Sequence, residues 1–369
     1  MGVSLTLPKL IFGAGSLSAL AGELALLALS RPLLISDRGL EGAGLVAVVQ
    51  RAAEGPAVSF LDVPENPTAA GADAALRAYL DGNCDGIIAL GGGSVLDTAK
   101  IVAALAMLDG SAARDLIGKP ELLRAVAPLI AIPTTVGTGS ECSPVAALHL
   151  ETHGPAIGTR SALLVPRVAL CDSDLARTLP RKLIAATAID ALSHCIEGFF
   201  AEPANPVIDA LALDGIARVF ADVHAAMTPE GDTGRASLMA AAYAGGAAIH
   251  KGLGPAHAVA LACGDQDVHH GTIIGVALPA TVRLLAAHLP AKAARIKIAI
   301  GLADDADLGT ALGRLINSLG LPLGLGAAGY ELHDADLLVR NMVASPFNRT
   351  SPYAPTADEY RSILTEIAA

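Results

Sequence analysis

The chain contains no tryptophan, and aromatic residues make up only 3% of its 369 residues. Charged residues are also scarce, at 17%, whereas 53% of the residues are hydrophobic. A chain of this length and composition can bury a sizeable core. Because aromatic side chains are so few, the core must be packed mainly by alanine, leucine, glycine and valine, which favours close contacts between helices and between helices and sheets.

Positive charge is in deficit, with 25 Lys and Arg residues against 36 Asp and Glu residues and a net charge of −11. Nucleic acid and anionic membranes are therefore not expected as partners, because both bind basic surfaces. No uninterrupted apolar run reaches the length of a membrane span, and the first residues lack the features of a signal peptide. The five cysteines form no CxxC pair, so a reduced, cytoplasmic protein is expected.

The first half of the chain alternates between two patterns. Short apolar segments predict buried strands at 32–37, 87–90, 129–133 and 168–172. Helical patterns lie between them, at roughly 16–29, 69–80 and 95–108. This alternation predicts a parallel, doubly wound sheet, in which ligands bind beyond the carboxyl ends of the strands. Later residues show mainly helical patterns, so we expect an α/β domain over 1–177 and an all-helical domain over 178–369.

The segment "IIALGGGSVLDTAK" at 87–100 places a glycine corner between a predicted strand and a predicted helix. Gly91, Gly92 and Gly93 are followed by Ser94. Glycines let a backbone approach a phosphate closely, and the amides at a helix N-terminus point toward such an anion. The segment is therefore a candidate phosphate cradle, and the alternative is a tight turn that binds no ligand.

Three further features lie at or near predicted strand ends. Asp97 and Lys100 share one helical face, where they are either contacts for a ribose or nicotinamide amide or an ordinary surface pair. The hydroxyl-rich loop "IPTTVGTGSE" at 132–141 suits the lining of a cofactor site. Asp37 ends the first clear strand, where an acid can bond the ribose hydroxyls and disfavour a 2′-phosphate, so NAD is favoured over NADP. The alternative for Asp37 is a simple turn acid.

A candidate metal site lies in the second half. Asp190 and His194 are four residues apart on a helical stretch, which places both on one face. His257 and His270 frame a downstream loop of small residues. One carboxylate and three imidazoles can bind a divalent metal and leave a position open for substrate. Each histidine taken alone fits a structural role better than a ligand role, but half of the ten histidines gather in this region: His194, His250, His257, His269 and His270.

Taken together, these residues resemble the iron-containing (group III) alcohol dehydrogenases, which share a superfamily with glycerol dehydrogenases and dehydroquinate synthases. The resemblance covers nearly the whole length and rests on the motifs "FGAGSL", "ENPT", "GGGSVLDTAK", "IPTTVGTGSE", "AIDALSHCIE", "KGLGPAHA" and "HHGTIIGVALP". It implies a dehydroquinate synthase-like fold, with a Rossmann-like dinucleotide domain, a helical metal-binding domain and an active site in the cleft between them. It also implies hydride exchange between NAD(P)(H) and an alcohol/aldehyde pair.

The resemblance assigns roles residue by residue. The implied metal ligands are Asp190, His194, His257 and His270. His270 is favoured over its neighbour His269 because the family ligand directly precedes a glycine, here Gly271. The implied cofactor residues are Asp37 for the ribose, Gly92, Gly93 and Ser94 for the pyrophosphate, Asp97 and Lys100 near the nicotinamide, and Thr134, Thr135 and Thr138 in the second loop.

The chain departs from the family pattern at two positions. Many members carry a proton-relaying histidine four residues after the third ligand, where this chain has Leu261. A lysine usual in the segment that ends "LLVP" is absent near Ala156, and Arg160 is out of register with it. His250 stands where relatives often have glutamine. It is a candidate substitute relay, and the alternative is a buried, hydrogen-bonded histidine.

The expected activity is a metal-dependent, NAD-linked interconversion of a small primary alcohol and its aldehyde, with Fe²⁺ or Zn²⁺ as the metal and a homodimer or larger homo-oligomer as the assembly. An ω-hydroxy acid is a candidate substrate, with Arg349 either its anion partner or an ordinary surface arginine. Two alternatives remain open. One is a cyclase or lyase of the dehydroquinate-synthase kind that uses NAD transiently, and the other is a cofactor-binding protein with little catalysis.

Overall fold

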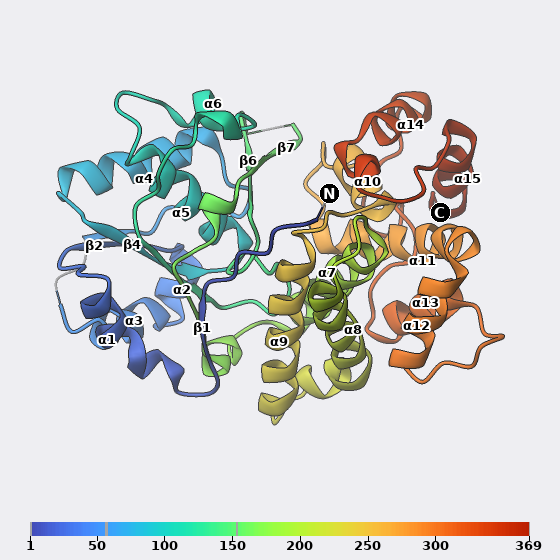
Figure 1. Cartoon of the computed structure of the whole chain (residues 1–369), viewed down its shortest axis with the longest axis horizontal. Helices are drawn as coiled ribbons and strands as arrows, with labels where there is room; N and C mark the ends of the chain where they lie inside the picture. The colour runs from blue at the N-terminus through green and yellow to red at the C-terminus, as the bar shows by residue number, and fades with distance from the viewer. Residues whose placement is uncertain (1, 56–57, 153, 369) are drawn as a thin grey trace. The chain divides into compact units, whose positions relative to one another are not determined.

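The structure, a computed structural model, describes residues 2–55, 58–152 and 154–368 (Figure 1). Its contacts divide the chain into two compact units. The α/β unit comprises 6–135 and 139–179, and the helical unit comprises 2–5, 136–138 and 180–368. The short segment 136–138 therefore belongs with the helices although the sequence around it belongs to the α/β unit.

The α/β unit is built on a six-stranded sheet in the order β1-β8-β5-β4-β2-β3, and all its pairings are parallel. Its strands are β1 (Lys9–Phe12), β2 (Pro32–Ile35), β3 (Val58–Phe60), β4 (Gly86–Gly91), β5 (Leu129–Pro133) and β8 (Val168–Cys171). A separate antiparallel pair consists of β6 (Val145–His149) and β7 (Ala156–Arg160). The predicted parallel sheet is confirmed, whereas the sequence patterns did not reveal β3, β6 and β7.

Helices cover both faces of this sheet. They are η1 (Ser16–Ala19), α1 (Leu20–Leu26), α2 (Arg38–Gly42), α3 (Leu45–Ala52), α4 (Ala69–Asp81), α5 (Gly93–Leu105), α6 (Ala113–Leu116), η2 (Pro120–Leu122), η3 (Ala162–Leu164) and η4 (Ser173–Ala176). The helix predicted at 16–29 is thus a short η1 followed by α1, and the helix predicted at 95–108 begins earlier, at Gly93.

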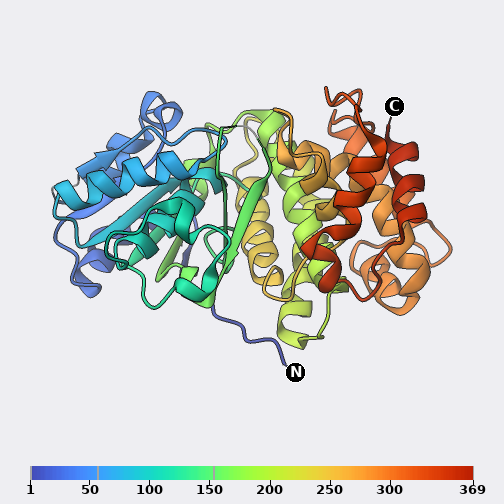
Figure 2. The same cartoon turned by 90° about the horizontal axis from the view of Figure 1, so that it is seen from above.

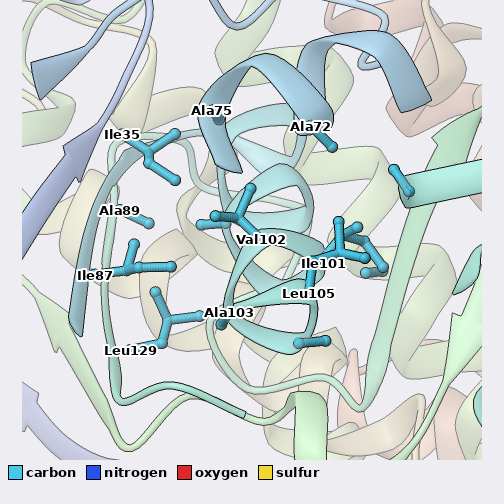
Figure 3. Close-up of a cluster of buried hydrophobic side chains, with 14 of the residues drawn as sticks. Ile35, Ala72, Ala75, Ile87, Ala89, Ile101, Val102, Ala103, Leu105 and Leu129 are labelled. Carbon is cyan, nitrogen blue, oxygen red and sulfur yellow. The ribbon is translucent and has the colours of Figure 1, made fainter. Parts of the chain in front are cut away.

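Alternate residues of the central strands enter different cores, as the two-residue period of a strand requires. Ile35, Ile87 and Ala89 face α4 and α5 (Figure 3). Leu34 and Ile88 belong to the core on the opposite face, with α1 and α3. Because both faces are covered, the central strands are apolar at every position, and this explains why they were recognisable as continuous apolar runs.

The helical unit contains no strand among its described residues (Figure 2). Its helices are α7 (Arg181–Phe200), α8 (Pro206–Ala226), α9 (Asp232–Ala248), α10 (Pro255–Ala262), α11 (His270–His288), α12 (Pro290–Ala299), α13 (Leu308–Ser318), α14 (Ala335–Ala344), η5 (Pro346–Arg349) and α15 (Ala357–Ile367). By length and composition alone, α7 and α11 could cross a membrane, but 94% and 61% of their most apolar windows are buried inside the protein. They are core helices of this unit.

Small residues bring the helices of this unit into close contact. A side chain added at Gly198 on α7 would place its Cβ 2.6 Å from Ala248 Cβ and 2.8 Å from the Ala248 carbonyl oxygen, at the end of α9. A Cβ at Gly245 would lie 3.0 Å from His194 Cβ. The Ala- and Gly-rich second half of α9 therefore allows α7 to approach so closely that no methyl group fits at Gly198.

A Gly198→Ala substitution tests this packing. We expect it to lower the free energy of unfolding by about 1–3 kcal/mol, because overpacking outweighs the gain in helix propensity. The matched control is Gly313→Ala on α13, where an added Cβ meets no atom within 4 Å and should stabilise the protein by about 0.5–1 kcal/mol. Denaturant unfolding of both variants measures the difference. An unchanged midpoint for Gly198→Ala would contradict the close contact.

Candidate metal centre and cofactor site

Helix α7 supplies the first two candidate metal ligands. Its sequence is apolar on nearly all sides, which is typical of a helix surrounded by others, and every residue from Ile184 to Phe200 is buried. Asp190 and His194 lie one turn apart on it, with His194 Nε2 3.7 Å from Asp190 Oδ1. Two polar side chains are therefore held on one face of a core helix, out of contact with bulk solvent.

His257 joins them from the beginning of α10. The candidate ligand atoms of Asp190, His194 and His257 all lie within 4.8 Å of one another. The three residues are 6%, 6% and 3% exposed. The His194 and His257 rings stack with their centroids 4.9 Å apart, and the edge of Phe347 contacts the His257 ring. The structure thus brings together three of the four predicted ligands in one buried cluster.

The fourth predicted ligand, His270, begins α11 at the margin of the cluster. Its Nε2 lies 3.9 Å from Asp190 Oδ1, and its side chain is 54% exposed. An added Cβ at the next residue, Gly271, would lie 2.5 Å from the Ala186 carbonyl oxygen, so this glycine lets α11 begin directly against α7. His269 is the N-cap residue of α11, and the ring contact with His257 is made by His270.

The electrostatics of the cluster fit a divalent cation. Burial raises the pKa of Asp190, and the nearby His270 and His257 oppose that shift. Burial and the neighbouring His257 lower the pKa of His194 to about 3, so its imidazole is neutral near pH 7. Asp190 Oδ1 and His257 Nε2 are buried without a hydrogen-bond partner. A carboxylate, neutral imidazoles and unsatisfied buried acceptors form a donor set for Fe²⁺ or Zn²⁺.

The glycine corner lies at the carboxyl ends of two neighbouring strands. A Cβ at Gly91 would lie 2.6 Å from Val95, and a Cβ at Gly92 would lie 2.9 Å from Thr135 Cγ2. The Thr134 amide donates to the Gly91 carbonyl oxygen at 3.1 Å. The two predicted cofactor loops are therefore adjacent. Contacts with Val95 and Thr135 already require small residues at Gly91 and Gly92, whether or not a phosphate binds there.

Gly93 is the first residue of α5, whose N-cap Gly92 has no capping side chain. The amides of this first turn therefore have no side-chain cap, as a phosphate site requires. The Ser94 hydroxyl donates to the Glu65 carbonyl oxygen. Thr138 lies in the segment 136–138 that clusters with the helical unit.

Asp37 is the N-cap residue of α2 and follows the end of β2. Its Oδ1 accepts a hydrogen bond from the Leu40 amide at 2.9 Å, and its side chain is partly exposed. This position fits both a simple turn acid and a contact for the ribose. One carboxylate oxygen caps the helix. The carboxylate also stands at the edge of the sheet where nucleotides bind in such folds.

Asp97 and Lys100 are engaged inside the α/β unit. The Lys100 ammonium is fully buried and donates to the Ser143 carbonyl oxygen, the Ser143 hydroxyl and the Val145 carbonyl oxygen. Asp97 accepts from the Ser140 hydroxyl and from the Ala147 amide. Together the two side chains tie α5 to the start of β6. Their predicted contact with the nicotinamide or the reacting groups stays a prediction, since every hydrogen bond found here serves the fold.

Two further residues, His250 and Leu261, lie close to the candidate ligand His257 along the chain. His250 is 5% exposed in the turn after α9, where its amide donates to the Ala247 carbonyl oxygen. Leu261 is on α10, four residues after His257 and thus on the same face. The relay role proposed for His250 stays a prediction.

Sequence reasoning missed Glu197, which is buried on α7 and contacts His257. Its signal was present, because Glu197 follows His194 by three residues and Asp190 by seven and so lies on the same helical face. In the sequence, Glu197 stands out only as the last residue of the motif "AIDALSHCIE", which does not indicate its partner.

Comparisons with known proteins agree with this architecture. Residues 8–173 match the family described as "Iron-containing alcohol dehydrogenase", and residues 184–368 match "Fe-containing alcohol dehydrogenase family, C-terminal". The 4-hydroxybutyrate dehydrogenase of Cupriavidus necator is 36% identical over 95% of this chain and 96% of its own. The structure of a 1,3-propanediol oxidoreductase superposes with a TM-score of 0.93, 26% identity and complete coverage of both chains. The sulfoacetaldehyde reductase of Bifidobacterium kashiwanohense, solved with NAD⁺, gives 0.91, 25% identity and 100% and 99% coverage.

The two-part architecture with a buried carboxylate–imidazole cluster is that of a metal-dependent dehydrogenase, and the chain belongs to the iron-containing alcohol dehydrogenase family. The resemblance found in the sequence is thereby confirmed. The protein is therefore an alcohol dehydrogenase of this family, and Asp190, His194 and His257 form the group of its side chains that would hold a metal ion.

A Lys100→Met substitution tests the structural role of the buried ammonium. We expect it to lower the free energy of unfolding by about 3–5 kcal/mol, because removal of one partner leaves buried polar groups unpaired. Lys119→Met, at an exposed position of the same unit, should change it by no more than about 0.5 kcal/mol. Chemical denaturation of both variants makes the comparison. Equal stabilities would show that the three hydrogen bonds of Lys100 contribute little.

Proposed function

We propose that this protein interconverts a small ω-hydroxy acid and its semialdehyde, with NAD(H) as the hydride carrier and a divalent metal at the Asp190–His194–His257 cluster. The observation that carries the proposal is that cluster, with its buried and unsatisfied carboxylate and imidazole atoms. The similarity to a 4-hydroxybutyrate dehydrogenase supports the choice of substrate class.

Asp190, His194 and His257 would hold the metal, with His270 as the fourth ligand. A divalent cation there supplies Lewis acidity to an alcohol or aldehyde oxygen and lowers the pKa of the alcohol. The protein's own side chains set the conditions for this chemistry. Burial keeps His194 neutral and therefore available as a donor, and the packed helices around α7 exclude water from the carboxylate of Asp190.

Residues of the α/β unit would bind NAD, which supplies the hydride acceptor. The backbone amides at Gly92, Gly93 and Ser94 would take the pyrophosphate, because they form an uncapped helix N-terminus. Asp37 would accept hydrogen bonds from the adenosine ribose and so favour NAD over NADP. Thr134 and Thr135 would line the neighbouring loop, next to Gly91 and Gly92.

Arg349 is the candidate partner for the substrate carboxylate. It ends η5 and is exposed, and Phe347 of the same short helix contacts the ring of His257. Because it follows Phe347 by two residues, Arg349 is the candidate for the positive charge that a carboxylate substrate needs. A hydroxy acid is thus favoured over an uncharged alcohol.

An NADH-oxidation assay of iron-loaded, anaerobically purified protein tests the activity and its substrate class. We expect turnover of succinate semialdehyde to exceed that of butanal, and a chelator or an Asp190→Asn substitution to lower it more than about 100-fold, since metal binding requires the carboxylate. Asp214→Asn, at an exposed position of α8, is the matched control and should retain activity.

Each part of the proposal has its own contradicting result. Full activity in the presence of chelator would overturn the metal dependence. Equal turnover of the two aldehydes would overturn the hydroxy-acid assignment alone. Tightly retained NAD without net NADH consumption would point instead to a cyclase that uses the cofactor transiently.

An Asp37→Asn substitution tests the ribose contact separately from the helix cap. Asparagine caps a helix about as well as aspartate, so the fold should be preserved while the charge is lost. We expect NADH to bind about 10–100-fold more weakly, as loss of a charged hydrogen bond implies, and NADPH to bind comparatively better. Fluorescence titration measures both affinities, with the exposed Asp81→Asn as control. Unchanged NADH affinity would assign Asp37 to capping alone.

A further inference from the structure

Glu197 is a charged side chain almost completely enclosed in the helical unit. Its side chain is 1% exposed. It lies on α7, on the same face as Asp190 and His194. A buried carboxylate is costly unless its oxygens accept strong hydrogen bonds, and both oxygens of Glu197 do so.

The first oxygen completes the N-terminus of α10. Glu197 Oε1 accepts from the Ala256 amide at 2.6 Å. This helix has no capping side chain of its own, because its N-cap is Gly254 and its first residue is Pro255. A Cβ at Gly254 would lie 3.0 Å from Oε1, so the glycine leaves room for the carboxylate. The positive end of the helix dipole adds to this contact.

The second oxygen contacts the ring of a candidate ligand. Glu197 Oε2 lies 2.6 Å from His257 Nδ1. An ionised carboxylate can only accept, so the proton of a neutral His257 ring must be on Nδ1 and the lone pair on Nε2. Nε2 is the buried atom that lacks a hydrogen-bond partner, and His257 belongs to the cluster with Asp190 and His194.

We infer that Glu197 is a positioning residue for the metal centre, holding the beginning of α10, the rotation of the His257 ring and its Nδ1–H tautomer with one carboxylate. The inference rests on the proposed metal function of the cluster. One face of α7 then contributes two ligands directly and orients a third. Phe347 also contacts the His257 ring edge-to-face, with the ring centroids 5.6 Å apart.

A Glu197→Gln substitution separates this role from simple filling of space. Glutamine has nearly the same shape, but it has one accepting oxygen and one donating nitrogen. If its oxygen faces the Ala256 amide, its NH₂ group faces Nδ1 and shifts the proton of His257 to Nε2, the atom that would bind the metal. If it is turned over, two donors oppose each other at the Ala256 amide. The turned-over arrangement keeps the Nδ1–H form but leaves two buried donors unpaired at the start of α10. We therefore expect the first arrangement, in which the proton of His257 moves to Nε2.

The first measurement is the tautomer of His257 in metal-free protein labelled with ¹⁵N-histidine. Its ring signals are identified by their absence from a His257→Gln spectrum, and one- and two-bond correlations report which nitrogen carries the proton. We expect the Nδ1–H form in the unmodified protein and its loss in Glu197→Gln. A proton on Nε2 in the unmodified protein would overturn the inference without any need for the variant to fold.

The second measurement is the affinity for Co²⁺ or Zn²⁺, obtained by competition with a chromophoric chelator. We expect Glu197→Gln to bind about 10–100-fold more weakly, the loss typical for a residue that orients a metal-binding histidine. Asp209→Asn is the matched control. Asp209 is also a buried acid of this unit, but its partner is Lys251 at 2.6 Å. That variant should unfold at lower denaturant concentration with unchanged metal affinity.

The outcomes are distinct. Metal affinity of Glu197→Gln within twofold of the unmodified protein would overturn the inference, as would an equal loss in Asp209→Asn, which would show a general effect of destabilisation. If the unmodified protein bound neither cation, the proposed function would fail. The tautomer spectra would still decide whether Glu197 orients His257.

Discussion

A carboxylate and two imidazoles buried within 4.8 Å of one another are the constraint on which the helical unit depends. Polar groups in such a place lose their hydration, and the loss must be offset by partners inside the protein. Glu197 supplies one such partner to His257. Asp190 Oδ1 has no hydrogen-bond partner among the described residues, and a bound cation would compensate its charge.

Small residues make this arrangement possible. Gly198 and Gly245 let α7 and α9 approach each other around His194, and Gly271 lets α11 begin against the backbone of α7 at Ala186. These contacts are the structural counterpart of a composition poor in aromatic residues and rich in alanine and glycine. A core of larger side chains would separate the helices and with them the candidate ligands, which come from three different helices.

The α/β unit positions its candidate residues through its parallel strands. Its predicted cofactor-binding residues stand at the carboxyl ends of β2, β4 and β5, and the parallel pairing of these strands brings them to one edge. The buried Lys100 and Asp97 then fix the start of β6 beside α5 through hydrogen bonds to backbone groups and hydroxyls. The residues of the motif at 91–100 thus divide between two tasks, since its glycines stand at this edge while Lys100 is enclosed.

Much of this protein could be predicted from its sequence by itself. The central strands are buried on both faces, so they are apolar at every position and need no knowledge of their neighbours to be recognised. The four-residue spacing of Asp190 and His194 places them on one face of any helix. Short or half-exposed strands such as β3 and β7 carry no such local signal, because their pairing partners determine them.

Only the tertiary structure decided the remaining roles. Whether Lys100 faces a ligand or the protein depends on where β6 lies, and whether Glu197 is a surface acid or the partner of His257 depends on how α10 meets α7. These outcomes are set by contacts between residues more than forty positions apart. Local periodicity reports which face of a helix a side chain occupies, but the chemistry of that side chain is decided by what the fold places opposite it.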